Sequence, residues 1–277
     1  MQDAFAYCAE LVRAADRDRF LAALFAPDEL RQALQALYAF NIEVARVREA
    51  AREPMPGEIR LQWWRDVVSG ERAGEAQANP VAAALLATIE RHGLAAGRLT
   101  ALIEARRSDL YDEPMATLAD LETYASNTSS ALFSLAGQIL GADAEAAAEP
   151  AGIAYAITGL VRAFPLHAAR RQVFVPAELL DRHNVRIEDI LAGQSSADLN
   201  AALAALRDLA REQLRAARGP MLALPPAALP AFLPAALVRP SLDRLDRCDA
   251  FAPVELSLWR RQWLIWRAAR NPVRIAG

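Results

Sequence analysis

The sequence has no lysine, little cysteine and no long uninterrupted apolar run. All 31 basic residues are arginine, which we attribute to genome composition and from which we infer no function. The two cysteines, Cys8 and Cys248, lie far apart and match neither a metal-binding nor a redox spacing. We therefore expect both to be buried or free thiols in a reducing compartment.

The chain also lacks an excess of basic residues, because its formal net charge is −3. This balance argues against the broad basic surface that binds nucleic acid, so no nucleic-acid partner is expected. The first residues, Met1-Gln2-Asp3, lack the basic region and apolar run of a signal peptide. The apolar stretch 219–240 is interrupted by six prolines, and we expect no apolar run to span a membrane. We expect a cytoplasmic protein, with peripheral attachment to the inner membrane as an alternative.

The residues that are abundant predict helices. Alanine and leucine dominate, runs of β-branched residues are scarce, and periodic apolar segments follow one another with short proline or glycine interruptions. A chain of 277 residues can bury a sizeable core, and no stretch has the composition of an interdomain linker. We predict one all-α domain over residues 1–277, with a helix over 4–24 that is broken by the charged run 16–19 and a helix from 29 that is interrupted at 53–57. Further helices are predicted over 58–68, 81–92, 121–140, 151–167, 177–183 and 195–218.

Two predicted helix faces, over a hundred residues apart, carry candidate functional residues. The first face has residues at helical spacing: Leu34, Leu37, Tyr38, Asn41, Ala45 and Glu49. The second face lies in the segment 158–175 and has the same spacing: Thr158, Arg162, Ala163 and His167. Pro165 predicts that this second helix kinks or ends near Arg162. We expect both faces to turn toward one central cavity.

These two segments resemble the motifs of the squalene/phytoene synthase family. That family carries Tyr-Ala-Phe/Trp-Cys-Arg-x-x-Asp-Asp-x-x-Asp on one helix and a second Asp-x-x-x-Asp on a facing helix, and the aspartates hold magnesium ions against the diphosphates of two prenyl substrates. The first motif is aligned by Tyr38-Ala39-Phe40. The resemblance implies the isoprenoid-synthase fold, an all-α bundle around a central cavity. It places the four metal-binding positions at Ala45, Glu49, Ala163 and His167.

Only one of these four positions holds an acidic residue. Magnesium is a hard cation that prefers oxygen ligands, and alanine supplies none. Glu49 opposite His167 is a poor magnesium site, and with one nearby acid and no second histidine we expect no metal at His167. We therefore expect no cofactor, although active members of the family use magnesium.

A divergent branch of the same family resembles more of the chain. It comprises the mitochondrial complex I assembly factors of the squalene/phytoene-synthase type and their bacterial relatives. The matching blocks follow one another from about Leu34 to Pro176 and are residues 39–47, 53–65, 124–130, 162–167 and 170–176. Resemblance to this branch implies a role in assembling respiratory complex I, with subunits of that complex as partners.

Other positions equivalent to the family's pocket complete the candidate site. Asp109 matches an aspartate that faces the diphosphate site in the synthases, and an ion pair with Arg106 is the alternative. The polar run 126–130 needs hydrogen-bond partners, so it lines a wet cavity or contacts carbonyl groups of a neighbouring helix. The full set of candidate pocket residues is Tyr38, Asn41, Glu49, Asp109, Tyr124, Asn127, Arg162, His167 and Arg171.

The last predicted helix combines tryptophan with arginine. Its apolar face holds Leu256, Trp259, Trp263 and Trp266, and the surrounding positions hold Arg260, Arg261, Arg267 and Arg270. We favour packing of this face in the core. The alternative is peripheral contact with a membrane, in which the arginines meet anionic lipid headgroups.

Three functions are compatible with these features. The one we favour is a family member that has lost head-to-head prenyl transfer and retains a binding or interaction role, as in complex I assembly. The second is a transferase that binds an isoprenoid diphosphate or another anionic lipid through arginines in place of metal, with Arg46, Arg48, Arg162 and Arg171 as candidates. The third is a helical module that docks on membranes. Whether the chain is an enzyme stays open; if active, it is expected to be a prenyltransferase.

Overall fold

The structure, a computed structural model, describes residues 1–51 and 53–276. Within these residues the secondary structure is helical throughout, without a strand, as the sequence predicts. The first half of the chain forms α1 (Gln2–Ala15), α2 (Arg17–Ala23), α3 (Asp28–Ala45), α4 (Val47–Ala50), α5 (Pro54–Val68), α6 (Ala73–Ala76), α7 (Pro80–His92), α8 (Ala96–Ala105), the 3₁₀ turn η1 (Ser108–Leu110) and α9 (Leu118–Ala125). These elements carry the first motif.

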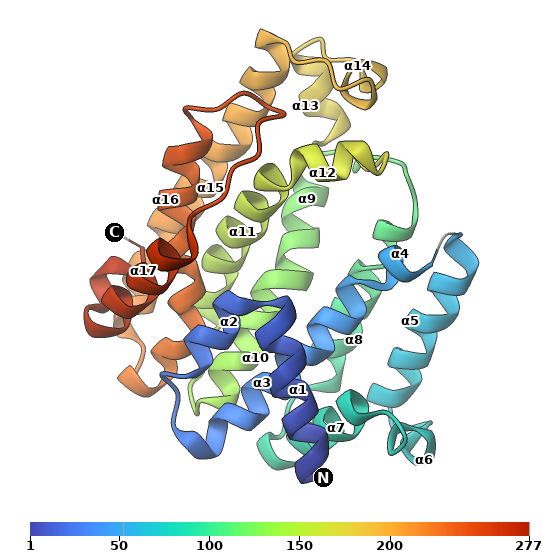
Figure 1. The fold of residues 1–277 in the computed structure, drawn as a ribbon, viewed down its shortest axis with the longest axis vertical. Helices are drawn as coiled ribbons and strands as arrows, with labels where there is room; N and C mark the ends of the chain where they lie inside the picture. The colour runs from blue at the N-terminus through green and yellow to red at the C-terminus, as the bar shows by residue number, and fades with distance from the viewer. Residues whose placement is uncertain (52, 277) are drawn as a thin grey trace.

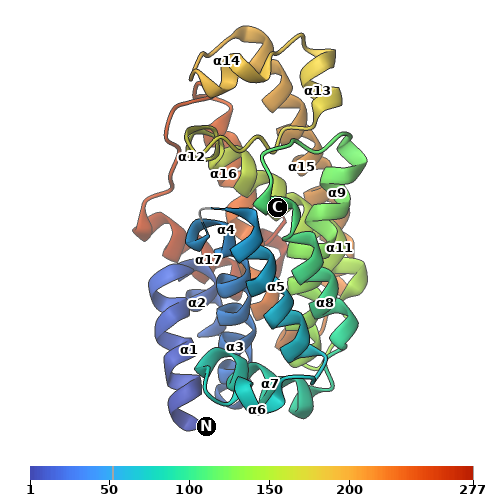
Figure 2. The ribbon, with the colours of Figure 1, turned by 90° about the vertical axis from the view of Figure 1, so that its right-hand side faces the viewer.

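The second half begins with a π turn, η2 (Ser126–Ser130). It continues through α10 (Ala131–Ile139), α11 (Glu145–Arg162), α12 (Phe164–Ala169), α13 (Ala177–Arg182), α14 (Ile187–Leu191), α15 (Ala197–Ala223), the 3₁₀ segment η3 (Pro226–Leu237), α16 (Val238–Leu245), α17 (Leu258–Arg270) and η4 (Pro272–Arg274). Figures 1 and 2 show α13 and α14 at one end of the long axis, with α6 and α7 at the other. Among the described residues no helix is both long and apolar enough to cross a membrane.

Helix α11 connects the two parts of the hydrophobic core. Its first turns, at Ala147, Ala148 and Ala151, contact α10 and belong to one buried cluster with residues of α1, α3 and α7. Its later turns, at Ile157 and Val161, pack with buried residues of α13, α15 and α16. Because α11 also runs alongside α15, the second motif at its C-terminal end has a fixed position in the bundle.

The predicted helix over 4–24 is divided at Asp16. This residue has φ −137° and ψ 74°, outside the helical region, and its side chain accepts a hydrogen bond from the backbone N–H of Arg19 at 3.1 Å. An aspartate that caps the following helix competes with continuation of the preceding one. Because of this division, the side chains of Asp18 and Arg19 lie in the interior of the protein, where both are buried.

Helix α3 ends earlier than the first motif requires. Its last residue is Ala45, and Glu49 belongs to the separate short helix α4. Glu49 is therefore not in the same helix as Tyr38, and the prediction of one helix from 29 up to the interruption at 53–57 is wrong. The end of α11 at Arg162 is confirmed, since α12 starts again at Phe164 with Pro165 in its first turn.

The predicted helix over 121–140 is α9, η2 and α10 in succession, so its centre is widened into a π turn. Helix α11 passes very close to this turn, and a Cβ atom on Gly152 would lie 2.3 Å from the backbone nitrogen and Cα of Ser130. Glycine is therefore required at this crossing. Cys8 is buried, Cys248 is partly buried, and both are free thiols, as expected.

Candidate functional site

The space between the two motif helices beside Tyr38 is occupied by an arginine from α2. The guanidinium carbon of Arg19 lies 5.8 Å from the ring centroid of Tyr38 on α3 and 4.9 Å from that of Tyr155 on α11. Its Nη1 donates to Asp16 Oδ2 at 2.5 Å. Burial acts to lower the pKa of Arg19, but Tyr155 and Asp16 raise it overall, so the side chain stays cationic.

Sequence reasoning missed Arg19, because the charged run at 16–19 looked like a helix break. Burial raises the pKa of Tyr38, so its hydroxyl is not ionised at neutral pH. Asn41 is also buried on α3, three residues further along the helix.

The four positions that hold metal in the synthases lie on α3, α4 and around α12. Ala45 ends α3, and Ala163 joins α11 to α12. Glu49, with a side chain that is 49% exposed, accepts a hydrogen bond from Arg170 Nη1 at 2.6 Å. Glu49 of α4 therefore meets the end of α12, but its carboxylate is paired with a guanidinium.

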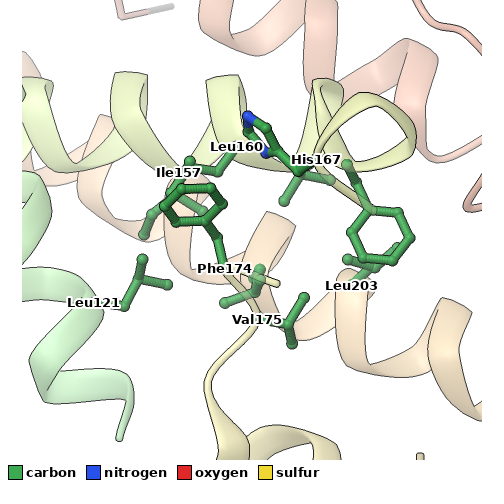
Figure 3. A pocket seen from close by; sticks show the side chains of 10 residues that line it. Leu121, Ile157, Leu160, His167, Phe174, Val175 and Leu203 are labelled. Atoms are coloured by element: carbon green, nitrogen blue, oxygen red, sulfur yellow. The ribbon is translucent and has the colours of Figure 1, made fainter. Parts of the chain in front are cut away.

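His167, on α12, points into an apolar pocket between α9, α11 and α15. Its ring centroid is 4.7 Å from that of Phe174, and Figure 3 shows both rings with Leu121, Ile157 and Leu203 around them. Burial, with Arg170 nearby and against the opposing effect of Glu49, lowers the pKa of His167 to about 4. The imidazole is neutral at pH 7, and its buried Nδ1 has no hydrogen-bond partner among the described residues.

The pocket at His167 is narrow. Its free volume is about 10 Å³, the space of roughly one water molecule. The central cavity that we expected beside the second motif is therefore, at this place, too small for a prenyl chain.

These residues do not fit a magnesium ion. Two of the four positions are methyl groups, the third is a carboxylate bound by Arg170, and the fourth is a partly buried imidazole in apolar surroundings. Magnesium requires several oxygen ligands in octahedral geometry. In the part of the chain that the structure describes, no group of three or more histidine, cysteine, aspartate or glutamate side chains is arranged to hold a metal.

Asp109 and Tyr124, two of the candidate pocket residues, lie in contact. The Tyr124 hydroxyl and Arg106 Nη1 each donate to Asp109 Oδ2 at 3.1 Å, and Arg106 Nη1 also donates to the Tyr124 hydroxyl at 2.5 Å. Burial raises the pKa of Asp109, although Arg106 opposes the shift. The ion pair with Arg106, one of the two alternatives for Asp109, is thus formed.

Phe174 connects this cluster with the His167 pocket. Its ring centroid is 6.1 Å from that of Tyr124 and 4.7 Å from that of His167. The same loop places Gln172, whose side-chain N–H donates to the Asp109 carbonyl at 3.0 Å. The sequence singled out this segment only as a family block, without a role for either residue.

The polar run 126–130 finds its partners on helices. Ser130 Oγ donates to the Glu149 carbonyl of α11 at 2.7 Å, and Ser126 Oγ donates to the Glu149 carboxylate at 2.9 Å. Thr128 Oγ1 donates to the Tyr124 carbonyl at 2.7 Å. The contact with a neighbouring helix, one of the two alternatives, is present, while Asn127 is partly exposed on the same turn.

The candidate arginines do not converge on one place. Arg162 lines a surface pocket of about 320 Å³ together with Arg261 and Glu255. Arg48 lines another, of about 280 Å³, beside Glu49 and Arg170, and its Nη2 donates to Asp112 at 2.6 Å. Arg171 is exposed with φ 60°, and Arg46 is exposed at the end of α3. Within residues 1–51 and 53–276, Arg162 forms no ion pair.

Comparison with known proteins identifies relatives over nearly the whole chain. The family model described as squalene/phytoene synthase matches residues 12–267. The rat protein named NADH dehydrogenase (ubiquinone) complex I, assembly factor 6 is 33% identical over 94% of this chain and 82% of its own length. The human protein of the same name is 33% identical over 88% of this chain and 74% of its own. A 15-cis-phytoene synthase from Synechocystis sp. is 22% identical over 70% of this chain and 61% of its own.

Solved structures show the same fold. A dehydrosqualene synthase in complex with ligand superposes with a TM-score of 0.81 at 17% identity, covering 98% of this chain and 97% of the other. Squalene synthase HpnC from Alicyclobacillus acidocaldarius superposes with a TM-score of 0.77 at 23% identity, covering 88% and 94%. The all-α isoprenoid-synthase fold is thereby confirmed. The chain belongs to the squalene/phytoene synthase family, as a divergent member that lacks the paired magnesium-binding aspartates.

Proposed function

We propose that this protein acts in the assembly of respiratory complex I and does not catalyse magnesium-dependent head-to-head prenyl transfer. The observation that carries the proposal is the ion pair between Glu49 and Arg170, at the place where the synthases hold metal. The relatives named as complex I assembly factors, at 33% identity over most of both chains, support the assembly role.

The chemistry of prenyl transfer explains why the loss of metal-binding carboxylates argues against catalysis. Ionising an allylic diphosphate requires cationic charge held against the leaving group, and magnesium supplies it in active members. Here the carboxylate of Glu49 is paired with a guanidinium, and Ala45 and Ala163 offer no ligand. The partners under this proposal are subunits of the respiratory complex, and no cofactor is needed.

A second candidate function has its own supporting observation. Arg162 has no ion-pair partner among the described residues and lines the 320 Å³ pocket beside Arg261. A guanidinium can form paired hydrogen bonds with a phosphate, so this pocket is where an isoprenoid diphosphate or another anionic lipid would bind without metal. The carboxylate of Glu255, which lines the same pocket, repels an anion. We therefore favour the assembly role over this second function.

The experiment that tests the assembly role is genetic. Deleting the gene in the native host should lower the amount of assembled complex I, measured by native gel electrophoresis and by NADH:quinone oxidoreductase activity of the membranes. Wild-type protein and the Glu49→Ala variant should both restore it. An unchanged amount of complex I in the deletion strain would overturn the proposal.

A further inference from the structure

Helix α17 presents a tryptophan face to solvent, which is not the core packing that we favoured from the sequence. Trp259 is 83% exposed, Trp263 50% and Trp266 46%. These three residues lie at i, i+4 and i+7, so they share one face of the helix. The opposite face, with Ile265 and Ala268, is buried against η3 and α2.

The helix is fixed in this orientation by a buried ion pair. Arg261 Nε donates to Asp18 Oδ1 at 2.8 Å, and its Nη2 pairs with the other carboxylate oxygen. Asp18 is buried on α2. Figure 1 shows α17 at the side of the molecule beside α2, so the tryptophan face belongs to the outer surface.

Positive charge is concentrated on the same segment. Residues 258–277 contain five arginines and no acidic residue, whereas the rest of the chain has 26 arginines and 34 acidic residues. Four of the five, Arg260, Arg267, Arg270 and Arg274, form no ion pair among the residues that the structure describes. A protein of net charge −3 thus carries one surface segment of opposite sign.

The arginines and tryptophans of α17 are in direct contact. The guanidinium carbon of Arg267 lies 4.2 Å from the ring centroid of Trp263, and that of Arg270 lies 4.6 Å from that of Trp266. Each pair combines an aromatic body with a cationic group beside it. Indole rings favour the headgroup region of a bilayer, and neighbouring cations favour anionic lipid phosphates.

We propose that the α17 face formed by Trp259, Trp263 and Trp266, with Arg260, Arg267 and Arg270 at its rim, docks the protein on a membrane surface that contains anionic phospholipid. The exposed indoles and the charge complementarity carry this assignment. An acidic surface without an apolar layer would leave Trp259 in water, so the combination fits a bilayer interface better. Because the remaining surface is acidic, an anionic membrane repels it and selects the α17 face.

Flotation of the purified full chain with vesicles tests this proposal. Vesicles of phosphatidylcholine with phosphatidylglycerol should carry the protein, and vesicles of phosphatidylcholine alone should carry at least tenfold less. Trp259→Ala/Trp263→Ala/Trp266→Ala should lose vesicle binding at least tenfold. Arg260→Gln/Arg267→Gln/Arg270→Gln should bind both vesicle types equally weakly, and raising the salt concentration should weaken the wild type in the same direction.

A matched control tests whether any exposed apolar residue suffices. Met55 and Ile59 on α5 are 72% and 66% exposed, and Met55→Ala/Ile59→Ala should float like the wild type. Circular dichroism checks that each variant is folded. The proposal is overturned if the wild type ignores anionic vesicles, if the tryptophan variant floats as well as the wild type, or if the α5 variant loses binding equally. Because only protein and lipid are present, these outcomes are independent of the assembly role.

Discussion

Arg170 Nη1 lies 2.6 Å from Glu49 Oε1, and this contact between two residues 121 positions apart joins the end of α12 to α4. The motif alignment with the synthases of the same family assigns Glu49 to one of their metal-binding positions. The two side chains are about half exposed, so the pair contributes little to stability while it neutralises the only acid at the four positions.

We predict that Glu49→Gln changes the free energy of unfolding by less than about 1 kcal/mol, because exposed ion pairs contribute roughly 0–1 kcal/mol. Urea denaturation of the purified protein measures it. A loss of several kcal/mol would show that Glu49 has a structural role that the half-exposed pair does not explain.

Substitutions in the cluster of Asp109, Arg106 and Tyr124 should lower the free energy of unfolding much more than Glu49→Gln does. Asp109→Asn leaves the Arg106 guanidinium buried without its carboxylate, and we expect a loss of about 3 kcal/mol. Tyr124→Phe removes the hydroxyl that donates to Asp109 and accepts from Arg106, and because both partners are charged it should cost about 1.5–3 kcal/mol. Urea denaturation of both single variants and the double variant gives the coupling between them. Equal stability of Asp109→Asn and the wild type would contradict the assigned ion pair.

The close approach of η2 and α11 at Gly152 can be tested by substitution, with Gly159 of the same helix as a control. Gly152→Ala places a Cβ atom 2.3 Å from the Ser130 backbone, and we expect a loss of about 3 kcal/mol or more from overpacking. Gly159→Ala has nothing within 4 Å of the added atom, so helix propensity should make it neutral or stabilising by about 0.5–1 kcal/mol. Thermal unfolding of the two variants should separate them, and similar midpoints would be inconsistent with the close approach.

His167 should make the stability of the fold depend on pH. Its pKa is about 4 when folded, against an ordinary value near 6.5, because burial disfavours the charged imidazole. As pH falls, the unfolded chain therefore binds the proton at His167 first. The contribution of neutral His167 to the free energy of unfolding is fully present above pH 6.5 and is lost toward pH 4, by up to about 3 kcal/mol.

The matched variant for this prediction is His167→Leu, which cannot titrate and fills an apolar pocket. Urea denaturation at pH 7 and at pH 4.5 should show a smaller loss of stability for His167→Leu than for the wild type. An identical pH dependence of the two proteins would mean that His167 is not buried as the structure places it.

The fold and the family could be predicted from the sequence because they depend on local and ordered signals. Helical periodicity, the proline that ends α11 near Arg162 and the order of the motif blocks are all read along the chain. The loss of the aspartate pairs was equally visible, since it needs only the register set by Tyr38 for the first pair and by the segment 171–174 for the second.

The contacts across the bundle could not be predicted in this way. Arg19 reaches Tyr155 and Arg170 reaches Glu49 over separations that carry no spacing signal. The exposure of the α17 tryptophans was misjudged because an amphipathic helix has the same periodicity whether core, lipid or solvent covers its apolar face. Only the position of α17 against η3 and α2 distinguishes these cases.

Calorimetric titration of farnesyl diphosphate into the purified protein, with and without magnesium, tests most directly whether the metal-dependent site is lost. We predict that adding magnesium causes no increase in binding, for the wild type and for Glu49→Ala alike. Weak binding that ignores magnesium and disappears in Arg162→Ala would support the second candidate function. Binding that requires both magnesium and Glu49 would contradict the loss of the synthase metal site.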